Sequence, residues 1–159
     1  EMTRPVIQDT CAIAAVDANA TVPYHHTPHD VIEMGKSLLA DFNGTYMYYY
    51  TDMTRSHFFG KQTPNLQNVQ DTNLVGEADE RVDKLAEVDI AACTITKKYG
   101  YGDYLIHRAG HIWGIYFHVV PSVDIGENAH ISPGMVFSRE PGIYSSYYRM
   151  SRFKSKPPA

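Results

Sequence analysis

The sequence predicts a single α+β domain. Segments with the character of β-strands lie in the first and last thirds of the chain, and a helical block at 64–98 separates them. At 159 residues and 17.9 kDa the chain is long enough for one hydrophobic core. Its 43% hydrophobic and 20% charged residues are ordinary for a globular protein.

The N-terminal third predicts three strands and one loop. The apolar run 12–16 has the length of a short buried strand. Ranges 37–42 and 46–59 predict two more strands, and the second is rich in Tyr, Thr and Phe, which suit a pleated, half-buried surface. Range 21–28 contains two prolines and two histidines and predicts a loop.

Periodicity and turn residues predict the remaining elements. Inside the helical block, apolar residues recur at spacings of three and four and form one face of an amphipathic helix: Leu85, Val88, Ala92 and Ile95. Gly100 is placed to end this helix in a left-handed cap. Three strands joined by Gly and Pro turns are expected at 113–120, 135–140 and 143–148. The basic range 149–159 is expected to be a flexible tail of the single domain 1–159, rather than a docking segment for anions.

Composition excludes several functional classes. A net charge of −4 and a pI near 6.0 provide no basic surface for nucleic acid. No apolar run approaches the roughly 20 residues of a membrane span, and no signal peptide is expected. Because the chain begins with Glu1, we expect it to be a processed or excised piece. Two cysteines are too few for a disulfide scaffold, which favours a reducing, cytoplasmic compartment.

Two aspartates in the strand-like region are candidate metal ligands. A turn at 46–47 would make Asp41 and Asp52 direct cross-strand neighbours on one face, with Cβ atoms ~5 Å apart. Carboxylates at that distance repel each other unless a cation or a shared proton lies between them. A turn at Asn43-Gly44, a common hairpin signal, would give a different pairing. Taken singly, an aspartate is also a common turn or cap residue.

Histidines and a further carboxylate form two more candidate segments. His107, His111 and His118 stand at intervals of four and seven with glycines between them, which is not the pattern of an amphipathic helix. Neutral imidazole is a ligand for zinc, iron, manganese and cobalt. Glu140 ends an apolar strand, and the proline after it favours extended geometry. A carboxylate in that position needs a partner, either a metal or a neighbouring arginine.

In this order, these segments resemble the pita-bread metallopeptidases, which include methionine aminopeptidase, aminopeptidase P, prolidase and creatinase. Three collinear motifs carry the resemblance, which covers roughly 5–148: Asp41…Asp52-Met-Thr-Arg55, Gly100-Tyr-Gly-Asp-Tyr-Leu-Ile-His-Arg-Ala-Gly-His111, and Pro133-Gly-Met-Val-Phe-Ser-Arg-Glu140-Pro-Gly-Ile-Tyr144. The histidine four residues before His111 is similar to the aminopeptidase P and prolidase branch, which favours bonds next to proline. The resemblance implies a curved antiparallel sheet with helices packed outside it, incomplete here and shortened at both ends.

The resemblance also implies a role for each site residue. Four side chains would hold one or two divalent ions (Mn, Co, Zn or Fe): Asp41, Asp52, His111 and Glu140. His118 would be catalytic, contacting the substrate and stabilising the tetrahedral intermediate, while His107 would line the site and orient the substrate. Since a metal-activated water attacks a peptide carbonyl in this chemistry, the implied function is metal-dependent hydrolysis of the Xaa-Pro dipeptidase or aminopeptidase type.

The chain departs from the family pattern at several positions. The family has a fifth ligand, a glutamate on a final strand that bridges two metals, and no Asp or Glu follows Glu140 here. The family's upstream loop histidine falls on Tyr24 with His25 beside it, and both are candidate substrate-binding residues. One metal position would retain Asp52, His111 and Glu140, so at most one tightly bound ion is expected.

Two functions follow from these observations. The first is an active metallopeptidase with a peptide substrate. The alternative is a catalytically inactive pita-bread module that binds peptides or protein partners. Four retained ligands favour the first, and the missing fifth ligand favours the second. Neither nucleic acid nor a membrane is expected as a partner, and the twelve tyrosines are compatible with the interface of a homo-oligomer.

Overall fold

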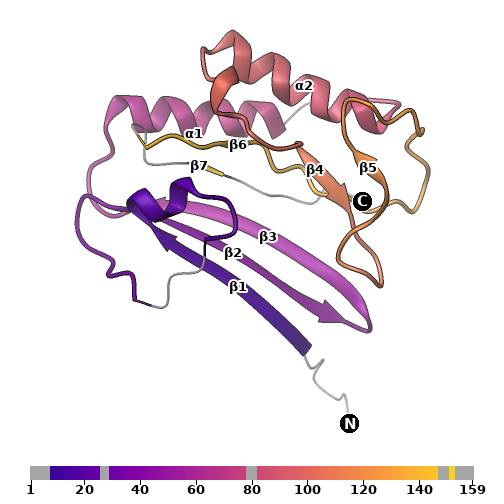
Figure 1. The fold of residues 1–159 in the computed structure, drawn as a ribbon, viewed down its shortest axis with the longest axis horizontal. Helices are drawn as coiled ribbons and strands as arrows, with labels where there is room; N and C mark the ends of the chain where they lie inside the picture. Colours follow the sequence, from indigo (N-terminus) through magenta and orange to yellow (C-terminus); the bar gives the residue numbers. More distant parts are fainter. Residues whose placement is uncertain (1–7, 26–28, 78–81, 147–150, 153–159) are drawn as a thin grey trace.

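The structure of the protein is a computed structural model that describes residues 8–25, 29–77, 82–146 and 151–152. The elements follow in the order β1 (Gln8–Val16), η1 (Asp17–Thr21), β2 (Ser37–Tyr46), β3 (Tyr49–Phe58), α1 (Pro64–Glu77), α2 (Leu85–Lys98), η2 (Gly102–Tyr104), β4 (Gly110–Ile112), β5 (Val119–Val123), β6 (Gly142–Ile143) and β7 (Ser151–Arg152). Figure 1 shows three layers, with the two helices on one side, the short strands β4 to β7 beneath them, and the long strands β1 to β3 on the opposite side. Helices combined with antiparallel sheets confirm the α+β prediction.

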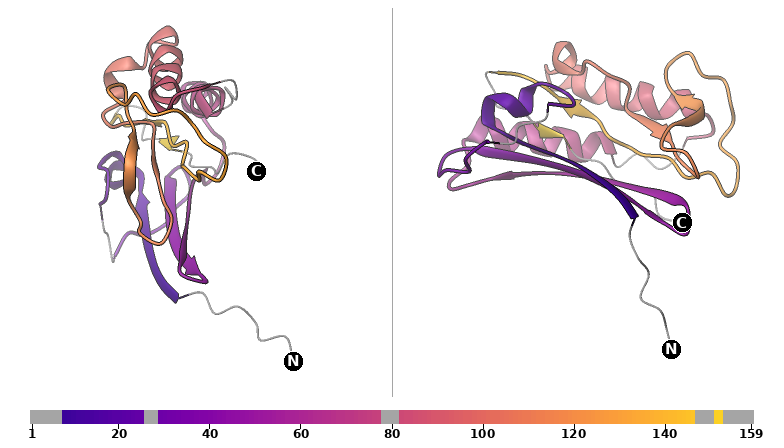
Figure 2. Two further views of the ribbon diagram at one scale, coloured as in Figure 1. Left: turned by 90° about the vertical axis from the view of Figure 1, so that its right-hand side faces the viewer. Right: turned by 60° about the horizontal axis from the view of Figure 1, so that its bottom comes forward.

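The long strands form one antiparallel sheet in the order β1-β2-β3, which confirms the predicted strands at 12–16 and 37–42. The strand predicted at 46–59 is confirmed for 49–58, while residue 46 ends β2 and 47–48 form the turn. Burial alternates along β2, where Ser37, Leu39 and Asp41 are buried and the residues between them are partly exposed. A side-chain period of two places alternate residues on opposite faces of a sheet. The second view of Figure 2 shows that one face of this sheet is directed toward the rest of the molecule. Burial also alternates along β3, as it does along β2.

The hairpin between β2 and β3 turns at Met47-Tyr48, one residue later than the first turn predicted and away from Asn43-Gly44. Both turn residues have positive φ, 49° and 70°, as a tight two-residue turn of a twisted hairpin requires. Positive φ costs a non-glycine residue about 1–2 kcal/mol. The longer ladder offsets that cost, because pairing runs unbroken from Ser37↔Phe58 to Tyr46↔Tyr49. A turn at Asn43-Gly44 would end β2 at residue 42 and lose the last of these pairs.

The predicted helical block is two helices, α1 and α2, and residues 78–81 between them lie outside the described part of the chain. The predicted apolar face of α2 is confirmed for Leu85, Val88 and Ala92, which are buried, whereas Ile95 is only partly buried. Leu85 and Val88 pack with three residues of the C-terminal segments: Ile112, Val123 and Phe137. Gly100 has φ of 82° and follows the helix directly, which confirms the left-handed cap. The packing of Leu85 and Val88 thus fixes α2 to the segments that carry the histidine motif.

The C-terminal strands differ from their predicted ranges. The strand expected at 113–120 is wrong for 113–118, which forms bends between β4 and β5, with the N–H of Gly114 donating to the carbonyl of Tyr116 (3.0 Å). Range 135–140 runs beside β4 and bridges it at Ile112↔Phe137, but it does not form a continuous strand. Of the strand expected at 143–148, only Ile143 belongs to a strand (β6) among the described residues 143–146, and 147–148 lie outside the described part of the chain. Glycines keep these segments short. Their backbones therefore pair with neighbouring segments at isolated residues rather than along continuous ladders.

Two predictions fall largely outside the described residues. These are the end of the loop at 26–28 and most of the tail at 149–159. Within the described residues, no helix has both the length and the apolar character that crossing a bilayer requires.

The close approach of β4 to range 135–140 gives a test of the fold. A Cβ added at Gly110 would meet the backbone of Ser138, with the carbonyl carbon 3.0 Å away and its oxygen closer still. We expect Gly110→Ala to destabilise the fold by about 1–3 kcal/mol, because backbone cannot yield as a flexible side chain does. Thermal unfolding should show a midpoint lower by about 2–4 °C for each kcal/mol.

The matched control is Gly114→Ala, since a Cβ at Gly114 would meet nothing within 4 Å. Equal melting temperatures for the two variants would contradict the close approach of β4 to Ser138.

Candidate metal centre

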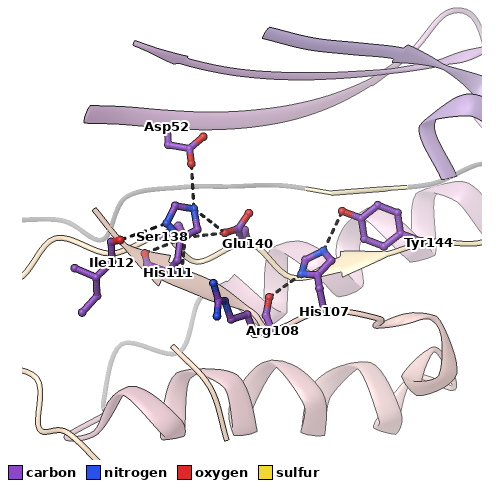
Figure 3. A network of polar contacts seen from close by, with 8 residues as sticks. All are labelled: Asp52, His107, Arg108, His111, Ile112, Ser138, Glu140 and Tyr144. Carbon is purple, nitrogen blue, oxygen red and sulfur yellow. Dashed lines mark hydrogen bonds and ion pairs between the residues drawn. The ribbon is translucent and has the colours of Figure 1, made fainter. Parts of the chain in front are cut away.

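Three of the four predicted ligands meet between the two sheet layers. The Nε2 of His111, on β4, lies 3.3 Å from Oδ2 of Asp52 on β3 and 3.3 Å from Oε1 of Glu140. Figure 3 shows Asp52 reaching down from the long sheet toward His111, and Glu140 reaching the same ring from the side. All three residues are buried, at 6%, 5% and 4% exposure for Asp52, His111 and Glu140. Asp52 and Glu140, which are 88 positions apart in the sequence (140 − 52), thus contact the same imidazole nitrogen of His111.

Backbone pairing brings His111 and Glu140 together. Ser138 N–H donates to the carbonyl of His111 (2.8 Å), and Glu140 N–H donates to the carbonyl of Ala109 (2.6 Å). The segment ending at Glu140 is therefore held antiparallel to β4, so that side chains two residues apart point the same way.

Ser138 orients two of the candidate ligands at once. Its hydroxyl accepts from the N–H of His111 (2.9 Å) and donates to Oε1 of Glu140 (2.9 Å), and the residue is completely buried. Sequence reasoning did not single out Ser138. The available signal was a serine two residues before Glu140 in an extended apolar segment, which places both side chains on one face.

Asp41 shares the face of Asp52 but is not its direct partner. In the observed register Asp41 pairs with Thr54, and Asp52 pairs with Asn43. The predicted direct pair is therefore replaced by a diagonal one, for which Cβ separations are about 7 Å rather than ~5 Å. Both aspartates are buried, at 8% and 6% exposure. Asp41 thus lies next to the His111 cluster, one step further along the ladder.

The other two predicted histidines flank the cluster. The rings of His118 and His111 have centroids 4.3 Å apart, although His118 itself is exposed. His107 is half-buried, and its Nδ1 lies 2.7 Å from the carbonyl of Arg108 and its Nε2 2.9 Å from the hydroxyl of Tyr144 (Figure 3). Because a carbonyl only accepts, Nδ1 of His107 carries a proton, and in the neutral ring Nε2 accepts from Tyr144.

A polar cavity of about 340 Å³ opens in front of these histidines. It is lined by Tyr24, His107, Arg108, His111, His118, Asp124 and Glu140. The prediction placed Tyr24 and His25 at the substrate site. Tyr24 does line the cavity, with φ of 61°, whereas His25 is not among its lining residues. An apolar cavity of about 970 Å³ lies on the other side, bounded by Asp52, Trp113 and the β2–β3 hairpin.

The donor set fits a divalent cation of intermediate hardness. Two buried carboxylates against one imidazole leave a net negative charge, even when the ring is protonated, and burial of such charge requires compensation. The two N···O separations of 3.3 Å are close to the ~3.4 Å between ligands bound ~2.1 Å from a tetrahedral ion. No cage of three or more His, Cys, Asp or Glu side chains stands ready for an ion among the described residues. The ligand heads contact one another instead, as Figure 3 shows.

Solved structures of prolidases share this fold. The prolidase from Pyrococcus furiosus superposes with a TM-score of 0.85 at 28% identity over 91% of this chain, and that from Thermococcus sibiricus with 0.84 at 30% identity over 94%. An X-Pro aminopeptidase from Thermotoga maritima matches in fold at 23% identity and a TM-score of 0.81. The fold is therefore the pita-bread fold of prolidases and aminopeptidases, as the sequence predicts.

Sequence comparison defines the family. The profile of metallopeptidase family M24 matches residues 7–155, and an Xaa-Pro dipeptidase from Pyrococcus furiosus is 36% identical over 129 residues. The chain belongs to metallopeptidase family M24, and its similarity lies with the Xaa-Pro branch. It spans 36% of the length of that relative and 44% of the Pyrococcus furiosus prolidase chain.

The double role of Ser138 is testable by removing its hydroxyl. Ser138→Ala leaves the buried N–H of His111 without its acceptor, which costs about 1–3 kcal/mol, and removes one hydrogen-bond donor from the carboxylate of Glu140. Urea unfolding should show the stability loss. Ser132→Ala is the control, because Ser132 is exposed in the same loop region. If both alanine variants unfold at the same urea concentration, Ser138 does not hold His111 as described.

Proposed function

We propose that this chain is the metal-binding part of a peptidase that hydrolyses Xaa-Pro peptides. One observation carries the proposal: the imidazole nitrogen of His111 lies between the carboxylates of Asp52 and Glu140 inside the fold of prolidases. Family membership and relatives named Xaa-Pro dipeptidase support it. The matched relatives give no support to an inactive binding module. That alternative is the contrary outcome of the turnover test below.

The proposed roles follow from the positions of the side chains. Asp52, His111 and Glu140 would hold the ion, with Asp41 beside them on the face of Asp52. When bound, a divalent ion supplies water activation and carbonyl polarisation. His118, exposed at the polar cavity with its ring tilted by 48° against that of His111, would donate a hydrogen bond to a developing oxyanion. His107, fixed by Tyr144, would orient the substrate in the same cavity.

Two further parts of the proposal concern the extent of the catalytic domain and the number of metal sites. Residues 1–159 would form one partial catalytic domain, since the chain spans well under half of the length of its relatives. Without the family's bridging glutamate, only the position of His111 would bind an ion tightly. The compartment, the choice among Mn, Co, Zn and Fe, and self-association remain predictions from the sequence.

Turnover is tested with an Xaa-Pro dipeptide such as Gly-Pro. We expect hydrolysis that requires added Mn²⁺ or Co²⁺ and stops when a chelator removes the ion. His111→Ala should abolish hydrolysis, because the ion would lose the imidazole ligand that lies between the two buried carboxylates. His130→Ala is the control, since His130 is exposed and bonded to Asp83 away from the site. Tight binding of the dipeptide without any hydrolysis would instead identify an inactive binding module.

Metal stoichiometry is tested separately by calorimetric titration of the metal-free protein. We expect at most one tight equivalent, lost in His111→Ala and retained in His130→Ala. Three protein ligands with an open fourth position are sufficient for one ion of the zinc type. Two tight equivalents would contradict the single-site proposal, and unchanged binding in His111→Ala would contradict the ligand assignment.

A further inference from the structure

A buried carboxylate on α2 lies behind the metal centre and is not one of its predicted ligands. Asp89 is 5% exposed, and both of its oxygens are bonded to backbone amides from other segments. The N–H of Ala109 donates to Oδ1 (2.8 Å), and the N–H of Ile125 donates to Oδ2 (3.2 Å). One helical side chain therefore joins the start of β4 to the segment after β5.

The first of these amides lies in the centre of the histidine motif. Ala109 stands two residues after His107 and two residues before His111. Its N–H is bonded to Asp89, and its carbonyl accepts from the N–H of Glu140 (2.6 Å). Ala109 is consequently fixed from both sides, by the helix and by the segment that carries Glu140. A displacement at Ala109 would shift His111 and Glu140 relative to each other.

The two amides belong to residues that directly follow charged residues of the cavity lining. Arg108 directly precedes Ala109, Asp124 directly precedes Ile125, and both line the cavity with His107. Hydrogen bonds to the two following amides hold these charged residues at a set separation. Asp89 itself is absent from the lining, and its hydrogen bonds reach the cavity through the backbone amides of Ala109 and Ile125.

Burial makes the charged form of the Asp89 carboxyl costly, and the two amide hydrogen bonds offset part of that cost. Burial raises the pKa of the Asp89 carboxyl, and the negative charge of Asp124 adds to this, while the two amide hydrogen bonds and the positive charge of Arg108 act in the opposite direction. An uncharged side chain would avoid the desolvation of a carboxylate in this layer. A carboxylate supplies two acceptors in one plane, which is what two amides from separate segments require.

We infer that Asp89 is a positioning residue for the metal centre, one that sets His107, His111 and Glu140 relative to one another through Ala109. The inference rests on the proposed function for its catalytic meaning, although its structural part concerns the protein without metal. Groups that orient metal ligands from behind change metal affinity or activity by 10–100-fold when removed.

The test compares Asp89→Ala, Asp89→Asn and the control Thr96→Val. Thr96 is buried on the same helix and bonds only to carbonyls of that helix through its hydroxyl, at Ala92 (2.9 Å) and Cys93 (3.1 Å). Co²⁺ binding is measured by calorimetry and by the visible spectrum of the bound ion. We expect Asp89→Ala to weaken Co²⁺ binding by about 10–100-fold and to alter the spectrum. Asp89→Asn, whose amide oxygen retains one acceptor, should show a smaller loss, and Thr96→Val none.

A second measurement needs neither metal nor turnover. In NMR spectra of the metal-free protein, Asp89→Asn should shift the amide signals of His111 and Glu140 as well as those of Ala109 and Ile125. Shifts confined to Ala109 and Ile125, with wild-type Co²⁺ affinity, would overturn the inference and leave Asp89 a purely structural residue. Failure of the wild-type protein to bind Co²⁺ would contradict the proposed function instead, and the NMR result would still decide the role of Asp89.

Discussion

The candidate site depends on one contact between two layers: a single imidazole nitrogen held between carboxylates from opposite sides. Asp52 comes from the long sheet, while His111 and Glu140 come from the short strands under the helices. Among the residues that the structure describes, no strand ladder pairs β3 with β4. The buried negative charge is tolerated only if the carboxylates and the imidazole remain together or take up a cation between them. The same contacts thus determine both how the two layers pack and what chemistry the site can perform.

The interactions around the site hold both backbone amides and side chains. Ser138 binds the N–H of His111 and the carboxylate of Glu140, and Asp89 binds the amide of Ala109 from the helical layer. The helices therefore do more than cover the short strands, because α2 contributes a fixed acceptor to the motif that carries the histidines. These bonds fix the backbone from which His111 and Glu140 project.

Strands and helices with a strong local pattern were predictable, and glycine-rich segments were not. The alternating strands of the hairpin and the apolar face of α2 follow directly from side-chain periodicity. Range 113–118 contains as many apolar and aromatic residues as a strand, yet it bends, because Gly114 bonds within the loop and to β3, where it accepts from the N–H of Tyr50 (2.9 Å). Local composition does not reveal such a bond between distant segments.

By itself, the sequence determined that Asp41 and Asp52 share a face. Any two-residue hairpin turn pairs an odd-numbered residue with an even-numbered one, so the two carboxylates lie on the same side wherever the turn occurs. Its three motifs also determined the family and the candidate ligands. Only the tertiary structure decided the register, which makes the aspartate pair diagonal, and the convergence on His111. The physical reason is that side-chain parity is local to each strand, whereas register and convergence depend on packing between segments far apart in the chain.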